Sequence, residues 1–248
     1  MAYDRLSALI QRFAMTITLA GTGDGNMRIL GDAETSLPTR VFFMPSRHVA
    51  AVSPTETVLF EAHVDWGGED NPLLAAMPSS LALGVDNDDI RLLVQVFLSE
   101  AEAQRCGAGI ALCRLAEVLM IRILRAQIEA GSTQAGLIAG LADPRISRAI
   151  VVMHDAPARD WRNEDLAVEA GMSLSRFSDV FKTRVGKTPQ AYLRQWRLTL
   201  SRQDIARGER VQSVARRYGY GSPEALTHAF TRQFGISPAN VKRNARGA

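Results

Sequence analysis

Two stretches near the end of this chain repeat one pattern. LAVEAGMSLSRFSDVFKTRVGKTP runs from Leu166 to Pro189, and VARRYGYGSPEALTHAFTRQFGISP runs from Val214 to Pro238. Each copy has an Ala four residues before a Gly, then a Phe five residues before a second Gly, and a Pro three residues later. A tight turn between two helices needs a Gly that tolerates positive φ and a small Ala where the helices cross. The repeat therefore predicts two helix-turn-helix units, an arrangement typical of proteins that bind DNA.

Proline after a capping residue marks the helix starts in this region. Thr188-Pro189, Ser222-Pro223, Ser237-Pro238 and Asp143-Pro144 each place a side-chain oxygen before a Pro, which is favoured at the first helical position. These signals predict an all-α domain over residues 143–248, with recognition helices over 174–185 and 223–234 and a connecting helix over 189–207. That connecting helix would be roughly 28 Å long. Successive major grooves are ~34 Å apart, so we expect the units to enter adjacent grooves.

Apolar residues of each recognition helix must face the core, which leaves a second set of side chains facing out. Arg can donate two hydrogen bonds to guanine, Ser and Thr contact base edges or phosphates, and acids accept from cytosine. Cations further along suit phosphates. The outward residues expected near bases are Ser175, Arg176, Ser178, Asp179, Glu224, Ala225, Thr227 and His228. The expected phosphate contacts are Lys182, Arg194, Arg197 and Arg232, with Arg202 as a further candidate.

Charge is distributed unevenly along the chain. Residues 1–143 hold 10 Lys and Arg against 17 Asp and Glu, whereas residues 144–248 hold 19 against 9. An acidic front and a basic back indicate a polyanion-binding domain beside one that does not bind polyanions. The charge coincides with the repeated motif, which strengthens the DNA-binding interpretation.

The front of the chain predicts strands and then helices. The runs over 13–19, 40–45 and 57–66 are rich in β-branched and aromatic residues and are separated by turn formers. In the last run Glu61, His63 and Asp65 alternate with apolar residues, which fits either a ligand or metal site or a solvent face. We expect the solvent face, because no second His cluster completes a metal site and His48 stands alone.

Two helices are expected over 89–104 and 109–130, since their apolar residues recur at helical spacing. The second helix is so broadly apolar that we expect it to pack on the sheet and also to form a dimer contact through Leu124 and Ile128.

Nothing in the sequence predicts export, a membrane span or a cofactor. Asp4, Arg5 and Arg12 interrupt any apolar signal core, and four charged residues interrupt the most apolar stretch. Cys106 and Cys113 are the two cysteines, which we expect to be buried thiols. We therefore expect a cytoplasmic, nucleoid-associated protein with no cofactor and no metal.

The repeated motifs resemble the C-terminal DNA-binding domain of the AraC/XylS family of bacterial transcription regulators. The second copy carries the resemblance best, over Ser213 to Arg243, and the first copy matches almost as well. In this family the base-contact region falls on the eight outward residues named above for base contacts. Pro223 stands where a polar contacting residue is common. The resemblance implies double-stranded DNA as partner, contact with RNA polymerase, a homodimer and an effector that is not identified.

The front half resembles the cupin-type sensor domains of one branch of the same family, through the segment VDWGGEDNPLLAAMPSSLAL and the two helices after it. A jelly roll needs about eight strands, whereas residues 13–66 offer room for four or five. The expected fold class is therefore α+β. It comprises a shortened cupin-like segment over 1–88, a helical linker or dimerisation segment over 89–142, and a double helix-turn-helix domain over 143–248.

Three functions are compatible with these features. The first is a sequence-specific transcription regulator that reads two adjacent grooves and is not an enzyme. The second is a metal-dependent cupin enzyme fused to a DNA-binding domain, which would need a His/Glu ligand set. The third is an architectural binder that uses charge alone and would lose affinity equally on all sequences as salt rises.

Overall fold

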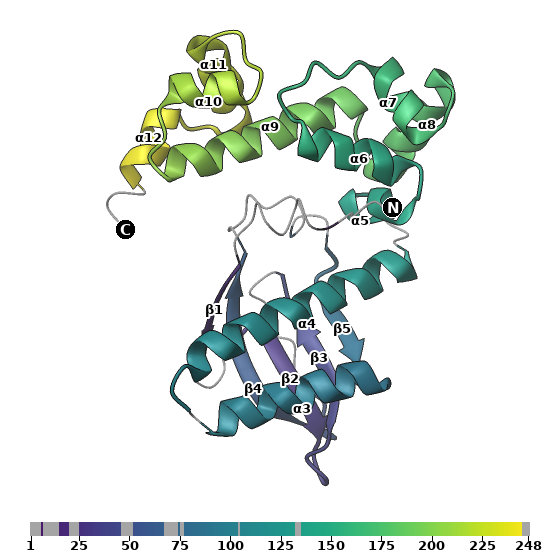
Figure 1. The fold of residues 1–248 in the computed structure, drawn as a ribbon, viewed down its shortest axis with the longest axis vertical. Helices are drawn as coiled ribbons and strands as arrows, with labels where there is room; N and C mark the ends of the chain where they lie inside the picture. Colours follow the sequence, from purple (N-terminus) through teal and green to yellow (C-terminus); the bar gives the residue numbers. More distant parts are fainter. Residues whose placement is uncertain are drawn as a thin grey trace. The chain divides into compact units, whose positions relative to one another are not determined.

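The computed structural model describes residues 6, 15–19, 25–45, 52–66, 74, 77–103, 105–131 and 135–244. His48 lies outside the described residues. The chain divides into two compact units, one formed by residues 13–132 and the other by residues 1–12 and 133–248. The α+β class is confirmed, because the first unit combines a sheet with helices and the second is helical in its described part (Figure 1).

Within the described residues, the first unit contains one antiparallel sheet of order β1-β4-β2-β3-β5. Its strands are β1 Thr16–Leu19, β2 Met27–Asp32, β3 Pro38–Phe43, β4 Glu56–Asp65 and β5 Leu81–Gly84. The three strands expected from the sequence correspond to β1, β3 and β4. The central strand β2 was not predicted, because Arg28 interrupts its apolar run and Gly31 weakens its strand propensity.

The expectation that Glu61 of β4 faces solvent is wrong. The Arg28 guanidinium of the neighbouring strand pairs with Glu61 at 2.7 Å, and the two side chains are only 6% and 10% exposed. The Gly25 backbone N–H donates to the same carboxylate oxygen at 2.9 Å. Glu61 therefore lies inside the unit, because an ionised carboxylate is tolerated there once it is paired and hydrogen-bonded. Asp65 is exposed, as expected, and His63 is half-buried.

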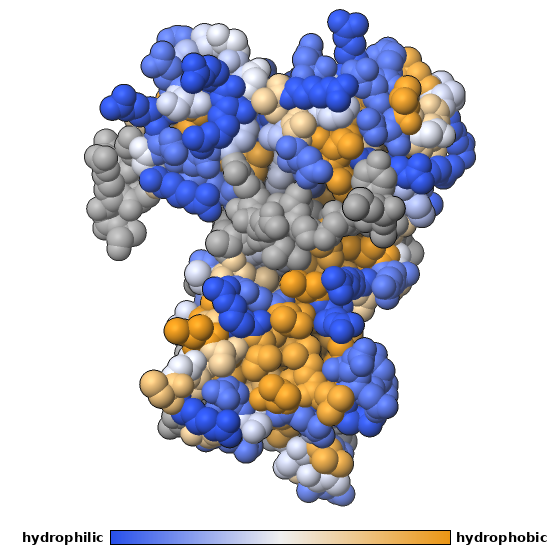
Figure 2. All heavy atoms as spheres, viewed as in Figure 1, coloured by the Kyte–Doolittle hydropathy of each residue, from blue (hydrophilic) through white to orange (hydrophobic). Residues whose placement is uncertain are grey.

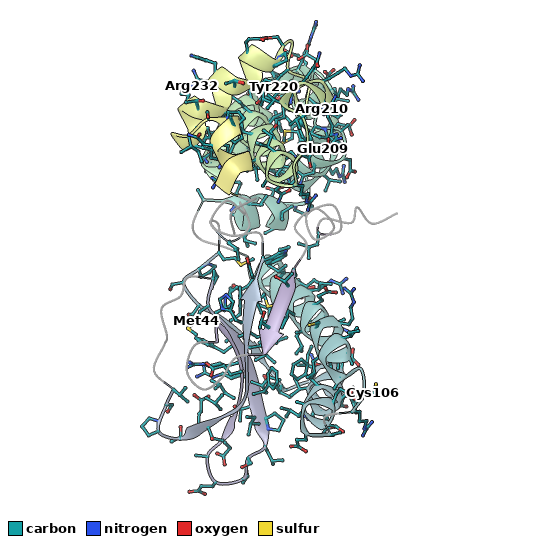
Figure 3. The ribbon with its side chains drawn as sticks, turned by 90° about the vertical axis from the view of Figure 1, so that its left-hand side faces the viewer. Met44, Cys106, Glu209, Arg210, Tyr220 and Arg232 are labelled. Carbon is teal, nitrogen blue, oxygen red and sulfur yellow. The ribbon has the colours of Figure 1, made fainter. Side chains whose placement is uncertain are left out.

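Two helices, α3 Asp88–Ala103 and α4 Ala108–Ala130, form a layer on one face of the sheet (Figures 1 and 3). Phe97 of α3 meets Phe60 of β4 edge-on, with ring centroids 4.6 Å apart. The prediction that Leu124 and Ile128 form a dimer contact is wrong, since they are 0% and 8% exposed and belong to this core. The sheet and α3 cover the α4 stripe more fully than the sequence suggested.

The second unit confirms the predicted helices of the repeated motifs. Its helices are α5 Leu137–Ala142, α6 Ile146–Asp155, α7 Asn163–Ala170, α8 Leu174–Val185, α9 Pro189–Ala206, α10 Val211–Arg217, α11 Pro223–Phe234 and α12 Pro238–Asn244. The short helix α5 was not predicted, and it packs against α6 and α8 within this unit. The predicted domain boundaries at residues 88 and 142 stay predictions.

A histidine lies in the core that joins α6 to α9. His154 is 7% exposed, stacks on Trp196 with ring centroids 4.0 Å apart, and its Nε2 lies 2.7 Å from the Tyr192 hydroxyl. Burial lowers the pKa of His154 from 6.5 to about 3. The imidazole is therefore neutral in the folded protein, where it fills space between the two helices.

The loop between α6 and α7 holds the second helix-turn-helix unit to the first. Arg197 of α9 donates from Nε to the Pro157 carbonyl at 2.5 Å and from Nη2 to the Arg159 carbonyl at 2.8 Å. Between these residues, the Ala158 carbonyl lies against Gly219, where a Cβ would be 2.6 Å from the oxygen. Since Gly219 lies in the turn of the second helix-turn-helix motif, this loop links the two motifs within the second compact unit.

We predict that the stability of the second unit falls as pH drops below 6.5. Unfolded chains take up a proton on His154 near that pH, whereas the folded chain does not until about pH 3. His154 therefore lowers the free energy of unfolding by up to ~1.4 kcal/mol for each pH unit that the pH falls. Urea unfolding from pH 7 to pH 5 should show that His154→Gln removes this part of the slope. A slope that His154→Gln leaves unchanged would contradict the assignment.

The two glycine turns of the repeat should differ in their response to alanine. Gly171 and Gly219 have φ of 65° and 73°, but nothing lies within 4 Å of a Cβ at Gly171. Gly171→Ala should cost only the strain of positive φ, about 1–2 kcal/mol. Gly219→Ala should cost more, because its methyl also meets the Ala158 carbonyl. Urea unfolding of the two variants measures the difference, and equal losses would refute the contact.

Candidate nucleic-acid interface

The recognition helix α8 separates its apolar and polar faces. Phe177 and Phe181 are fully buried. The opposite face carries the residues expected to contact DNA. Of these, Ser175, Arg176, Asp179 and Lys182 are exposed and Ser178 is half-buried. Ser175, Ser178 and Lys182 follow one another at three or four residues, and Arg176 and Asp179 lie beside them three residues apart, so all five share one side of the helix.

The second recognition helix, α11, has the same organisation. Leu226 and Phe230 are fully buried and hold the helix in its unit. Of the residues expected to contact DNA, Glu224, Ala225, His228 and Arg232 are exposed and Thr227 is half-buried. The Thr227 hydroxyl donates to the Pro223 carbonyl at 2.8 Å, so it serves its own helix in this structure.

The start of α11 is fixed by its cap. Ser222 Oγ accepts from the Ala225 backbone N–H at 3.1 Å, and Pro223 occupies the first helical turn. Glu224 receives hydrogen bonds from its own backbone N–H and then from Ser222, and these lower the pKa of its carboxyl. The group is therefore an anion at neutral pH, suited to accept a hydrogen bond from a base edge rather than to approach a phosphate.

The connecting helix α9 presents its cations in three different settings. Arg194 is exposed, whereas Arg197 is half-buried and donates to the two carbonyls described above. Burial lowers the pKa of Arg197. The Arg202 guanidinium lies over the Phe234 ring, 4.9 Å from its centroid. Sequence patterning could not separate these roles, because all three are arginines on one amphipathic helix.

Two adjoining hollows lie between α9 and α11. Arg194, Ala229 and Arg232 line both of them. Gln190, Leu193, Arg197 and Tyr220 complete one, and Lys187, Ala191, Gln195, Leu198 and Gln233 complete the other. Among the described residues that line these hollows, every charged side chain is a cation. Tyr220 was not predicted as a site residue, because its aromatic ring resembles any other core position of the motif.

No metal centre accompanies this surface in the described part of the chain. Among those residues no three His, Cys, Asp or Glu side chains come together in a way that could hold a metal ion. Cys106 is exposed and Cys113 is half-buried, which corrects the expectation that both thiols are buried. Among the described helices, none combines the length and apolarity needed to cross a membrane.

Comparison with known families gives one match in each half of the chain. Residues 166–244 match the model of a helix-turn-helix domain, and residues 21–129 match the model of a cupin. The first range contains the two recognition helices. The second contains β2 to β5, α3 and all but the last residue of α4, whereas β1 lies before it.

Curated relatives are similar over part of their length. A putative AraC-like transcription regulator of Streptomyces lividans is 37% identical over 132 residues, 52% of this chain and 43% of that protein. The HTH-type transcriptional regulator AlkR of Acinetobacter baylyi is 31% identical over 182 residues, 71% of this chain and 59% of that protein. The chain thus spans about half the length of the curated relatives it matches.

A solved AraC-type regulator from Chromobacterium violaceum is similar over 42% of this chain and 94% of its own, with 20% identity and a TM-score of 0.40. The helix-turn-helix and cupin matches of this chain, together with its AraC-like relatives, identify the chain as a member of the AraC/XylS family, with a cupin-type domain ahead of the helix-turn-helix domain.

Proposed function

We propose that this chain is a sequence-specific DNA-binding transcription regulator whose two recognition helices enter adjacent major grooves on one face of the duplex. The observation that carries this proposal is the pair of exposed polar stripes on α8 and α11, joined by one continuous helix. The helix α9 has 18 residues and is therefore roughly 27 Å long. Successive major grooves on one face are separated by ~34 Å, a distance that two helices flanking such a spacer can match.

The base contacts proposed on α8 are Ser175, Arg176, Ser178 and Asp179, and those on α11 are Glu224, Ala225, Thr227 and His228. Arg176 has the donor geometry to bind guanine with two hydrogen bonds. Lys182, Arg194 and Arg232 are exposed cations, which suits contacts with phosphates. Arg197 is the weakest of the proposed phosphate contacts, because two of its donors already serve backbone carbonyls.

The relatives support the regulatory part of the proposal through their names, since each is described as a transcription regulator. Neither is described as an enzyme. A cytoplasmic location beside the DNA, contact with RNA polymerase and control by an effector would follow from the same role. They are proposed here on the family relationship alone.

An apolar surface on the first unit supports a second copy of this chain as a partner. Figure 2 shows hydrophobic residues gathered over α3 and α4. Leu92 and Val96 of α3 are 61% and 55% exposed, and Ile110 and Val118 of α4 are 73% and 41% exposed. Large exposed apolar patches on a soluble unit mark association surfaces. A dimer would also join two DNA half-sites through effective concentration.

DNA fragments selected from random sequence by the full chain should share a motif, and footprinting on them should show two protected patches about one helical turn apart.

Within that complex, Arg176→Ala should cost ~1–3 kcal/mol of binding free energy on the selected duplex and relax the preference at one base pair. Lys182→Ala should weaken binding to selected and random duplexes alike and should reduce the salt dependence. Identical uniform losses from both variants would show that Arg176 does not read a base. Equal affinity of the wild type for all duplexes would favour the charge-only binder.

Charged substitutions on the apolar surface should separate the dimer. We expect Val96→Asp and Ile110→Asp to give a monomer by light scattering, because each places a carboxylate in an apolar contact while leaving the core untouched. Leu37→Asp is the matched control, since Leu37 is 65% exposed in the same unit but lies between β2 and β3. A wild-type chain that is monomeric at micromolar concentration would remove the basis for this interface.

A further inference from the structure

The hydroxyl of Tyr220 is a polar group that the fold does not satisfy. Its oxygen is buried and has no hydrogen-bond partner within the described part of the chain. Burial raises the pKa of the phenol, so the hydroxyl is neutral and able to donate. An orphaned hydroxyl inside a domain costs free energy, and a hydrogen bond to a bound partner would offset that cost.

The hollow in front of Tyr220 is suited to an anion. Arg194, Arg197 and Arg232 line it together with the phenol, and no carboxylate is among its described lining residues. The two guanidinium groups of Arg194 and Arg197 act on the phenol as charges that oppose the rise in its pKa. Figure 3 shows Tyr220 and Arg232 in the same part of the second unit. The volume of about 220 Å³ compares with about 30 Å³ for one water, so the hollow can admit a phosphate group.

The position of this hollow indicates which anion it receives. Arg232 continues the outward stripe of α11 that contains Glu224 and His228 at intervals of four residues. Arg194 lies on α9, the helix that leads back to the first recognition helix. The hollow therefore opens beside one base-reading stripe and along the helix that joins it to the other. A DNA strand that passes from one major groove to the next would present its phosphates along this path.

We propose that Tyr220, Arg194 and Arg232 form a seat for one backbone phosphate of the DNA strand that runs between the two recognition helices. This proposal rests on the proposed function. Once a turn of its ring brings the buried hydroxyl to the wall of the hollow, the phenol donates one hydrogen bond to a phosphate oxygen, and the two arginines supply positive charge. The seat carries no base information, but it fixes where both helices stand along the duplex.

Tyr220→Phe tests the hydroxyl alone. We expect roughly tenfold weaker binding of the full-length variant to both the selected and a random duplex, the effect of removing one hydrogen bond to a charged group. The salt dependence should stay as in the wild type, because the phenol carries no charge. Arg232→Gln should instead lower the slope of log affinity against log salt by about 0.9.

Stability provides the matched control. The Tyr218 hydroxyl, in the same turn, donates to Asp204 Oδ2 at 2.6 Å, so Tyr218→Phe should lower the Tm. Tyr220→Phe should leave the Tm unchanged or raise it, because it removes an unsatisfied group. A Tyr220→Phe variant that loses stability as Tyr218→Phe does would show a structural hydroxyl and overturn the proposal.

Single methylphosphonate replacements locate the phosphate. Along the strand between the two protected patches, one replacement should weaken wild-type binding and have little further effect on Tyr220→Phe. Losses that are additive with Tyr220→Phe at every position would contradict the proposed phosphate site.

A wild type that binds no duplex contradicts the proposed function itself, whereas a wild type that binds DNA no better than Tyr220→Phe contradicts only this inference. If inorganic phosphate at matched ionic strength raises the Tm of the wild type but not of Tyr220→Phe, and both bind DNA equally, the hollow takes a small anion and the DNA proposal is wrong.

Discussion

The hydrogen bonds that Arg197 donates to the Pro157 and Arg159 carbonyls determine how the two helix-turn-helix units are placed. A helix such as α9 sets the distance between two units but leaves their rotation about its axis to side contacts. Arg197 supplies one such contact, because it joins the middle of α9 to the loop that leads into α7. The Ala158 carbonyl between its two acceptors supplies another, because it lies against Gly219 in the turn of the second unit. Together these contacts fix the direction in which α11 faces relative to the first helix-turn-helix motif.

This arrangement explains why the duplicated motif is not used in the same way twice. In the first copy the turn glycine, Gly171, has open space beside it and serves only to allow positive φ. In the second copy Gly219 has the same backbone conformation and also allows close approach of another backbone. One residue type therefore meets two demands, of which only the first is common to both copies. The sequence repeat alone does not reveal the second demand, because the Ala158 partner is about sixty residues away.

Local signals were sufficient for the second unit but not for the first. Proline after a cap, glycine after a helix and a helical apolar stripe are all short-range, and they predicted the helices from α6 to α12. The strand β2 was missed because its key residue, Arg28, looks unsuitable for a core until its partner Glu61 is known. The same long-range pairing reversed the expected exposure of Glu61. For α4, the sequence showed how apolar the helix is but could not show that Leu124 and Ile128 are covered while Ile110 is not.

Within the candidate interface, the spacing of apolar residues predicted which side chains of α8 and α11 face outward. It did not predict which polar groups are hydrogen-bonded within the domain and which are not. Arg197 and Arg194 are three residues apart, yet one is used by the fold and the other is left to solvent. Tyr218 and Tyr220 are two residues apart, yet one hydroxyl is satisfied by Asp204 and the other has no partner in the described structure. Proteins tolerate such a cost where function needs the group, so stability and binding should respond in opposite directions to its removal. The contrast between neighbouring groups of the same chemical type separates side chains that build the domain from those that we propose to contact DNA.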